Sequence, residues 1–129
     1  MTPIAQPAPK PRTIVIVDDS RIVRERLIAM LNELPGVEIV GQAASVPEAI
    51  ETIRRLMPDT VILDIRMPGG TGLDVLRDIK QLDPAPLVIV LTNYAAPAYR
   101  EKCRQAGADF FFDKSTEFDR IPPLFERQS

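Results

Sequence analysis

Residues 60–73, TVILDIRMPGGTGL, carry the pattern that decides the fold of this chain. The stretch contains an uninterrupted apolar run that ends at Asp64, and a short run of this kind is typical of a fully buried β-strand. After it, Thr71 and Asp74 offer a weak version of the capping box that begins a helix. A buried strand followed by a helix is the unit from which parallel α/β sheets are built.

The same strand-helix unit recurs along the rest of the chain. We expect strands near residues 13–18, 37–43, 60–64, 87–92 and 108–113. The segments between them carry apolar stripes at helical spacing, namely Val23, Leu27, Met30, Leu31 and Leu34, then Val46, Ala49, Ile50 and Ile53, then Leu73, Leu76 and Ile79. These elements predict an α/β fold: a doubly wound, five-stranded parallel sheet with the flavodoxin-like strand order 2-1-3-4-5 and helices on both faces.

Start and stop signals agree with these boundaries. Ser45 with Glu48 forms a capping box, and Pro97 suits a first helical turn. The last helix is the weakest expectation, because Pro122 and Pro123 can begin a helix but cannot lie inside one. We expect only about two turns there, and we expect them to fray.

Length and composition favour a single domain. A chain of 129 residues with 45% hydrophobic content can bury one core but is short for two. Residues 1–12 contain four prolines and little to bury, which predicts a disordered, proline-rich leader ahead of a domain over residues 13–129. A passive tail is the simpler interpretation of this leader, and a ligand for a partner's groove is the alternative.

Charge, cysteine and histidine content exclude several classes of protein. The formal charge of −2 argues against a nucleic-acid-binding face, and no apolar run is long enough for membrane insertion. The single cysteine, Cys103, allows no internal disulfide and fits a cytoplasmic protein, in which we expect it to pack within a helix. The absence of histidine excludes Ser-His-Asp catalysis and means that any phosphohistidine must belong to another protein.

Polar residues close four of the five predicted strands. They are Asp18 and Asp19, Asp64, Thr92, and Lys114. Right-handed crossovers place these strand ends at one edge of the sheet. Three carboxylates brought together need a cation, and hard oxygen ligands favour Mg²⁺. Asp64 is then a candidate nucleophile toward phosphorus, with Thr92 and Lys114 binding oxygens of the transferred group.

Each of these residues also has a purely structural explanation when it is taken alone. Asp18 and Asp19 fit a helix cap and its solvated neighbour, and Asp64 fits an ordinary loop after a strand. Lys114 fits a surface lysine, and Thr92 fits a strand residue. Their occurrence in this order, each at the end of a predicted strand, favours a shared site instead.

These residues lie in segments that resemble the receiver domain of two-component response regulators, in a stand-alone form like the chemotaxis regulators. The resemblance covers residues 13 to about 121 and rests on IVDDS at 16–20, LDIRMPGGTGL at 63–73, VLT at 90–92 and GAD at 107–109 leading to Lys114. It implies that Asp64 accepts a phosphoryl group from a phosphohistidine. It also implies that Asp19, Asp64 and the backbone carbonyl of Arg66 ligate Mg²⁺, while Asp18 acts through a water.

The resemblance also implies a switch and a set of partners. Thr92 would hydrogen-bond the phosphoryl oxygen, Lys114 would pair with it, and Phe111 would be the aromatic switch. As the Thr92 hydroxyl moves toward the phosphoryl group, the Phe111 ring would turn into the vacated space and change a protein-binding surface. The neighbouring Phe110 and Phe112 are expected to pack in the core. The implied partners are a sensor histidine kinase or histidine phosphotransfer protein, and a downstream protein target.

Several positions shape this site in ways particular to the chain. Asn93 stands where the family usually has a very small residue, which predicts restricted access for small phosphoryl donors. Ser115 replaces a common proline, so no cis peptide is expected before it. Arg66 and Tyr94 are large residues at positions that in the family modulate attack by water, which predicts slow hydrolysis of the phosphoaspartate. The alternative is that both side chains simply point to solvent.

The function expected from the sequence is reversible phosphorylation of Asp64 in a signalling receiver, without turnover of a separate substrate. The alternatives are a receiver-like binding module that works without phosphorylation, and the receiver fragment of a longer DNA-binding response regulator. A phosphatase is disfavoured, because Arg66 stands where an aspartyl phosphatase carries its general acid. A flavodoxin-like cofactor binder is disfavoured because Asp18 and Asp19 would repel an anionic phosphate.

Overall fold

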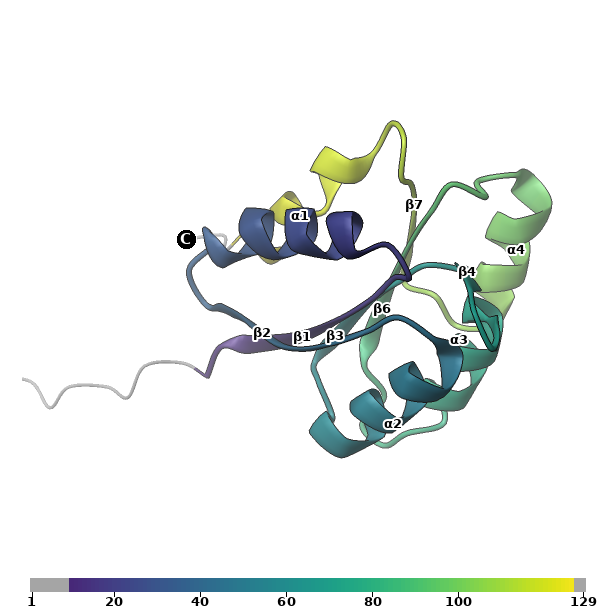
Figure 1. The fold of residues 1–129 in the computed structure, drawn as a ribbon, viewed down its shortest axis with the longest axis horizontal. Coiled ribbons are helices and arrows are strands. Elements are labelled where there is room, and N and C mark those ends of the chain that lie inside the picture. The colour runs from purple at the N-terminus through teal and green to yellow at the C-terminus, as the bar shows by residue number, and fades with distance from the viewer. Residues whose placement is uncertain (1–9, 127–129) are drawn as a thin grey trace, which may run out of the picture.

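A five-stranded parallel sheet forms the centre of the computed structural model, which describes residues 10–126 (Figure 1). Its strands are β1 (Arg12–Val17), β2 (Val37–Ala43), β3 (Thr60–Leu63), β6 (Leu87–Thr92) and β7 (Phe110–Asp113). They are arranged in the order β2-β1-β3-β6-β7, and every neighbouring pair is parallel. Counted within this sheet, the order is 2-1-3-4-5, so the predicted topology is confirmed.

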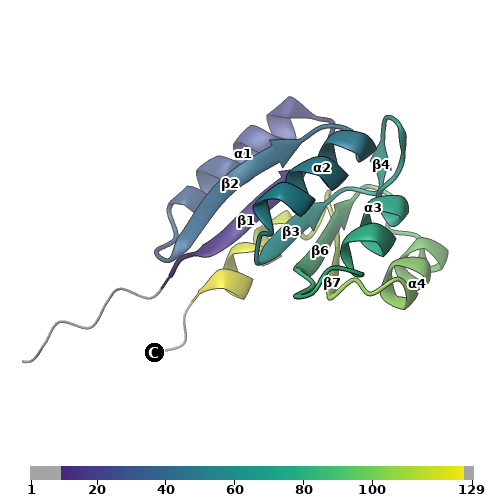
Figure 2. The ribbon, with the colours of Figure 1, turned by 90° about the horizontal axis from the view of Figure 1, so that it is seen from below.

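Helices cover both faces of the sheet. On one face lie α1 (Arg21–Asn32) and the carboxyl-terminal segment, and on the other lie α2 (Val46–Leu56), α3 (Gly72–Ile79) and α4 (Pro97–Gln105) (Figure 1, Figure 2). A short antiparallel pair, β4 (Arg66–Met67) with β5 (Gly70–Thr71), follows β3 and has no counterpart in the sequence-based prediction. Within residues 10–126, no helix is both long enough and apolar enough to cross a membrane.

The central strands β1, β3 and β6 are mostly apolar because both of their faces are buried. In β3, Val61 and Leu63 pack into the cluster formed with α2, α3 and α4, whereas Ile62 packs into the cluster formed with α1. A strand covered on one side only would alternate apolar and polar residues. Cys103 of α4 is fully buried in the first cluster, as predicted, and burial raises the pKa of its thiol to about 11.

The helix starts follow the predicted caps, with two differences of detail. Ser45 Oγ accepts a hydrogen bond from the Glu48 N–H at 3.3 Å, but the Glu48 carboxylate reaches the N–H of Ala44 at 2.7 Å instead of closing the box on Ser45 itself. Thr71 and Asp74, expected to make only a weak box, make the complete one. α4 begins with its proline, as predicted.

The carboxyl-terminal segment forms tighter turns than an α-helix. It contains two 3-10 helices, Phe118–Arg120 and Pro122–Phe125, in place of the expected final helix of about two turns. The paired prolines lack the backbone donors that α-helical hydrogen bonds need. The buried side chains of this segment are Phe118, Ile121 and Phe125, and they pack on the α1 face of the sheet.

The amino-terminal leader is described only from Lys10 onward. β1 begins at Arg12, one residue earlier than expected, and the Arg12 guanidinium donates a hydrogen bond to the Leu124 carbonyl at 3.2 Å. The end of the leader is therefore tied to the carboxyl-terminal segment. The predicted disorder of residues 1–9, and any fraying at residues 127–129, lie outside the described residues.

Candidate functional site

Three carboxylates meet at the edge of the sheet where β1 and β3 end. Asp18 and Asp19 directly follow β1, and Asp64 directly follows β3. One oxygen from each carboxylate lies within 4.8 Å of the others. Asp18 and Asp64 are buried, whereas Asp19 is exposed. The structure thus brings together the three acids that the strand ends predict, and this cluster could hold a metal ion.

Lys114, which directly follows β7, bridges the two buried carboxylates. Its Nζ lies 2.7 Å from Asp18 Oδ2 and 2.9 Å from Asp64 Oδ2. Burial by itself would lower the pKa of Lys114, but the hydrogen bonds with the two carboxylates outweigh that effect and raise the pKa above its ordinary 10.5. The lysine is therefore charged at neutral pH and offsets part of the negative charge of the cluster.

Asp18 is held by several hydrogen bonds. Its Oδ1 accepts from the Ser20 N–H at 2.8 Å, and its own N–H donates to the Ala43 carbonyl at 3.0 Å. Burial raises the pKa of Asp18 above its ordinary 3.8, and the hydrogen bonds from Lys114 and Ser20 only partly oppose this. The same Lys114 ammonium also contacts Asp64. Burial in the fold thus disfavours negative charge on Asp18.

Asp18→Asn is expected to raise the melting temperature of the metal-free protein by a few degrees at neutral pH. Because the pKa of Asp18 is raised, its contribution to stability is present below its ordinary pKa and is lost as the pH rises through the raised value. Asparagine removes that charge and still accepts from Ser20. Thermal unfolding in EDTA and in excess Mg²⁺ checks this, with the exposed Asp119→Asn as control. A lower melting temperature than wild type in EDTA would contradict it.

A pocket of about 320 Å³ opens beside the acidic cluster. Asp19, Asp64 and Lys114 line it, together with Arg66 and Tyr94. The Arg66 guanidinium lies 4.3 Å from the centre of the Tyr94 ring, so these two large side chains form one wall by contacting each other. A larger groove of about 950 Å³ lies where β1, β3 and β6 begin, at the opposite edge of the sheet, and is lined by none of these residues.

Thr92 and the loops around it connect the ends of β6 and β7. The buried Thr92 hydroxyl accepts a hydrogen bond from the Tyr94 N–H at 3.1 Å, and its carbonyl accepts from the Lys114 N–H at 2.9 Å. Ser115 Oγ donates to Asn93 Oδ1 at 3.2 Å. The peptide between Lys114 and Ser115 is trans, as predicted. Asn93 and Ser115, which follow Thr92 and Lys114 in the sequence, therefore contact each other.

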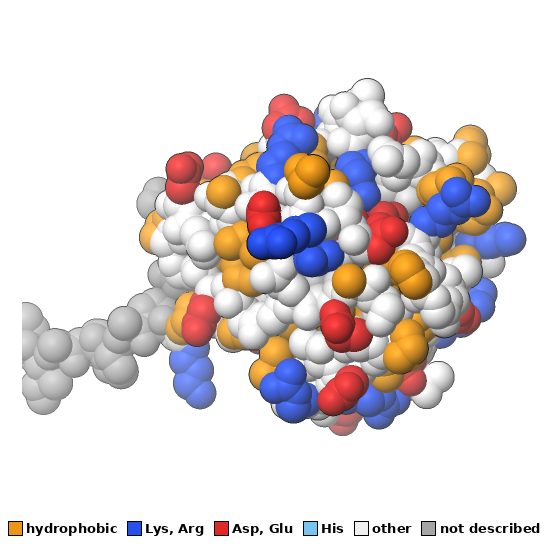
Figure 3. Space-filling view, in the orientation of Figure 1, with side chains coloured by type: hydrophobic (Ala, Val, Ile, Leu, Met, Phe, Trp, Pro, Cys, Tyr) orange, Lys and Arg blue, Asp and Glu red, His pale blue; other side chains and the backbone are white. Residues whose placement is uncertain are grey.

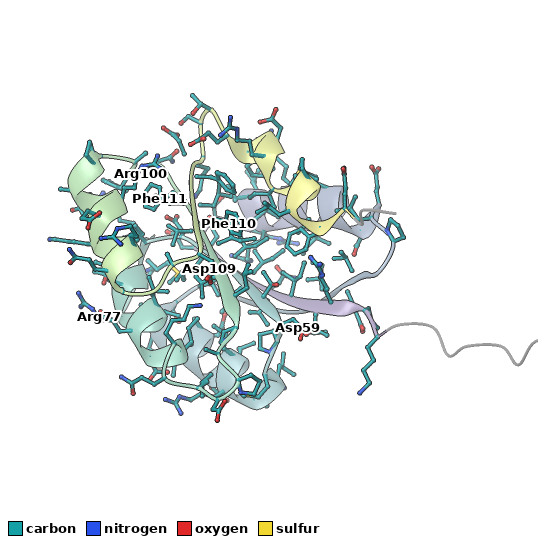
Figure 4. All side chains as sticks on the ribbon, turned by 180° about the vertical axis from the view of Figure 1, so that it is seen from behind. Asp59, Arg77, Arg100, Asp109, Phe110 and Phe111 are labelled. Atoms are coloured by element: carbon teal, nitrogen blue, oxygen red, sulfur yellow. The ribbon has the colours of Figure 1, made fainter. Side chains whose placement is uncertain are left out.

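Phe111 lies beside Arg100 of α4 (Figure 4). The Arg100 guanidinium carbon lies 4.6 Å from the centre of the Phe111 ring, and Arg100 Nη1 donates to the Phe111 backbone carbonyl at 3.3 Å. Phe112 is buried, but Phe110 is 36% exposed, so the expectation that Phe110 packs in the core is wrong. Phe110 stacks on Phe112 near the carboxyl-terminal segment, whose short 3-10 helices leave it partly uncovered.

One residue near the site was missed by the sequence-based prediction. Arg24 of α1 donates from Nη1 to the backbone carbonyl of Asp18 at 2.7 Å. The sequence could have indicated this contact, because Arg24 lies four residues after the helix cap Ser20. That spacing places Arg24 on the side of the helix that faces the acidic pair. Elsewhere, acidic and basic side chains are interspersed across the face shown in Figure 3.

Comparison with known proteins agrees with this geometry. The family model described as response regulator receiver domain matches residues 14–125. A protein-glutamate methylesterase/protein-glutamine glutaminase of Anaeromyxobacter dehalogenans is 43% identical over 94 residues, covering 70% of this chain and 26% of that protein. A relative of the same name from Xanthomonas campestris pv. campestris is 39% identical over 102 residues, covering 78% and 28%. The chain thus spans about a quarter of the length of these relatives.

Solved structures of response regulator domains share the fold. The signal receiver domain of the response regulator NarL from Mycobacterium tuberculosis superposes with a TM-score of 0.83 at 28% identity, covering 90% of this chain and 94% of that one. The response regulator domain of CheB from Thermotoga maritima gives a TM-score of 0.78 at 28% identity, covering 89% and 90%. Family model, relatives and fold agree, and the chain belongs to the response regulator receiver domain family of bacterial two-component signalling.

Proposed function

We propose that this receiver accepts a phosphoryl group on Asp64 from a phosphohistidine of a sensor histidine kinase or histidine phosphotransfer protein. The observation that carries the proposal is the cluster of Asp18, Asp19 and Asp64 within 4.8 Å, with Lys114 bound to two of them. A candidate nucleophile, a candidate cation site and the positive charge of Lys114 would thereby lie in one place. The chain contains no histidine, so the donor must be another protein.

The donor set of the cluster fits Mg²⁺, which prefers hard oxygen ligands and needs few of them from the protein. We propose Asp19, Asp64 and the backbone carbonyl of Arg66 as ligands, with Asp18 acting through a water. The geometry supports this, because three carboxylates lie together and a single Lys114 ammonium contacts two of them. When bound, the metal would offset negative charge on the transferred group.

Asp64 is the proposed nucleophile because it is largely buried yet borders the pocket from which a donor would approach. One of its carboxylate oxygens would form a P–O bond as the P–N bond of the phosphohistidine breaks. Lys114 and Thr92 would bind oxygens of the phosphoryl group. The Thr92 hydroxyl accepts from Tyr94, so its own hydrogen can be donated to such an oxygen.

Arg66 and Tyr94 are proposed to shield the phosphoaspartate from water, since their stacked side chains form a wall of the pocket. The double variant Arg66→Ala, Tyr94→Ala is expected to shorten the lifetime of the phosphoryl adduct on Asp64 several-fold. Intact mass followed over time after removal of the donor measures this lifetime. Tyr99→Ala is the control, because the Tyr99 ring packs against the Tyr94 ring, with 6.0 Å between the ring centres, but does not line the pocket. An unchanged lifetime in the double variant would count against shielding.

Phe111 is proposed as the switch that communicates phosphorylation to a downstream protein target. Its half-buried ring packs between the core and Arg100, where a change at Thr92 one strand away can alter its packing. Phe111→Ala is expected to leave phosphorylation of Asp64 intact and to reduce the difference in target affinity between the two phosphorylation states. Target binding is measured with and without the phosphoryl group. If the variant binds the target with the affinity of wild type both with and without the phosphoryl group, Phe111 is not the switch.

The role extended to this chain from its relatives is that of the receiver alone. Their names describe methylesterase and glutaminase activities, but the matched region is about a quarter of each. We infer that the chain assists its own phosphorylation and dephosphorylation and turns over no separate substrate. Its output would be contact with a protein target.

Intact-mass measurement after mixing the protein with Mg²⁺ and candidate phosphohistidine donors tests the proposed function. We expect a single phosphoryl adduct in wild type, dependence on Mg²⁺, and no adduct in Asp64→Asn. The exposed Asp119→Asn should behave as wild type. An adduct that persists in Asp64→Asn would assign the phosphoryl group to another residue. Failure with every donor would favour the phosphorylation-independent binding module.

A further inference from the structure

Arg24 connects three elements at the carboxyl edge of the sheet. Its Nη1 donates to the Asp18 carbonyl after β1 at 2.7 Å, and its Nε donates to Gln42 Oε1 of β2 at 3.0 Å. The side chain itself comes from α1 and is half-buried. The donors of arginine lie in one rigid plane. The bond to Gln42 therefore also sets the direction of the bond that the same guanidinium makes to the Asp18 carbonyl.

The peptide group that Arg24 contacts is the one between the two adjacent acids. Asp18 is held independently of Arg24, since its N–H, Oδ1 and Oδ2 bond to Ala43, Ser20 and Lys114 respectively. The Asp19 carboxylate is exposed and makes no hydrogen bond within residues 10–126 that would orient it. The direction in which Asp19 projects therefore depends on the plane of the preceding peptide, and Arg24 is the side chain that donates to the carbonyl of that peptide.

We propose that Arg24 is a positioning residue for the Mg²⁺ site: it holds the peptide between Asp18 and Asp19 so that the Asp19 carboxylate faces Asp64. The inference rests on the proposed function, because it concerns the same metal site. Groups that orient metal ligands from outside the coordination sphere typically contribute about 10-fold or more to metal affinity. Arg24 acts on the metal only through the backbone of its ligands.

The charge of Arg24 opposes its positioning role. A guanidinium near the site repels a divalent cation, so loss of the charge alone would tighten Mg²⁺ binding. Positioning predicts weaker binding instead. Arg24→Lys separates the two effects, because lysine keeps the positive charge but cannot bond the Asp18 carbonyl and Gln42 with one planar group.

Calorimetric titration of the full chain with Mg²⁺ alone tests the proposal. We expect the Kd for Mg²⁺ to rise about 10-fold in Arg24→Lys. Gln42→Ala leaves Arg24 in place but removes its second anchor, and a smaller rise in Kd is expected. Arg21→Lys is the matched control on the same helix, because Arg21 is exposed and, among residues 10–126, pairs only with Glu25. Its Kd should equal that of wild type.

Thermal unfolding distinguishes positioning from a merely structural role. A structural role lowers the melting temperature equally in EDTA and in excess Mg²⁺, whereas weaker metal binding reduces the stabilisation by Mg²⁺ specifically. An unchanged Kd in Arg24→Lys would overturn the inference and leave the proposed function standing. If Arg24→Lys does not fold, the Kd of Gln42→Ala for Mg²⁺ becomes the test. An unchanged Kd in that variant would overturn the positioning role of Arg24. A wild type that binds no Mg²⁺ would overturn both the inference and the proposed metal site.

Discussion

Gly72→Ala is expected to lower the free energy of unfolding by about 3 kcal/mol, the upper part of the usual range for forcing extra volume into a packed site. A Cβ at this position would overlap the backbone oxygen of Asp64 and lie 2.6 Å from the Cα of Ile65. Both are backbone atoms, so no side-chain rotation can relieve the overlap. The Gly72 N–H also donates to the Ile65 carbonyl at 2.5 Å, which fixes the start of α3 against the proposed phosphoacceptor segment.

Chemical denaturation measures this loss, and Gly41→Ala is the matched control. A Cβ at Gly41 would approach Leu56 Cδ1 at 2.9 Å and Thr52 Cγ2 at 3.1 Å, which are the ends of side chains that can turn. The loss at Gly41 should therefore be clearly smaller. A Gly72→Ala protein within about 1 kcal/mol of wild type would show that the backbone after Asp64 yields easily. The same displacement should reduce phosphoryl adduct formation, since it acts directly on Asp64.

The central sheet was predictable because a parallel sheet covered on both faces requires continuous apolar strands. The four-residue run of β3 is buried throughout, and its two neighbours, β1 and β6, are almost as completely buried. The carboxyl-terminal helix was not predictable in the same way, because two prolines at its start permit several kinds of turn. Phe110 is partly exposed because the carboxyl-terminal segment does not cover it fully. The neighbouring Phe111 and Phe112 gave no indication of this exposure.

The acidic cluster was predictable from topology alone, since parallel strands end at a common edge. The contacts of Arg24 and of Arg66 were not, because each joins residues that are distant in sequence and depends on side-chain direction. Arg24 reaches Gln42 across 18 positions, and Arg66 reaches Tyr94 on the loop after another strand. Sequence periodicity places a residue on a face, but it does not say which long side chains there will meet.

Lys114→Met is expected to cost about 3 kcal/mol of unfolding free energy in the metal-free protein, a cost typical of a buried charge that loses its partner. The two carboxylates that contact Nζ have side chains only 3% and 8% exposed. Methionine reproduces the apolar stem of lysine as far as Cε, so the change removes mainly the ammonium group with its charge and hydrogen bonds. Denaturant unfolding in EDTA measures the effect.

Excess Mg²⁺ should recover much of this loss, because a bound cation would compensate the same acids. Lys80→Met is the control: Lys80 pairs with Asp109 at 2.7 Å, but these side chains are 21% and 38% exposed. Such partly solvated pairs contribute at most about 1 kcal/mol. Among the described residues, Lys80 Nζ bonds to Asp109 and to the Pro86 carbonyl, and to no member of the acidic cluster. Equal losses in the two variants, or a loss in Lys114→Met that Mg²⁺ does not reduce, would contradict the prediction.

Adding Asp18→Asn to Lys114→Met separates charge compensation from the role of the lysine in phosphoryl transfer. If uncompensated charge causes the instability, removal of one carboxylate should restore stability, and the two substitutions should couple strongly. Phosphorylation should not be restored, because the phosphoryl group brings new negative charge to Asp64, 2.9 Å from the vacated Nζ position. A double variant that regains both properties would show that Lys114 serves only to balance the resting acids.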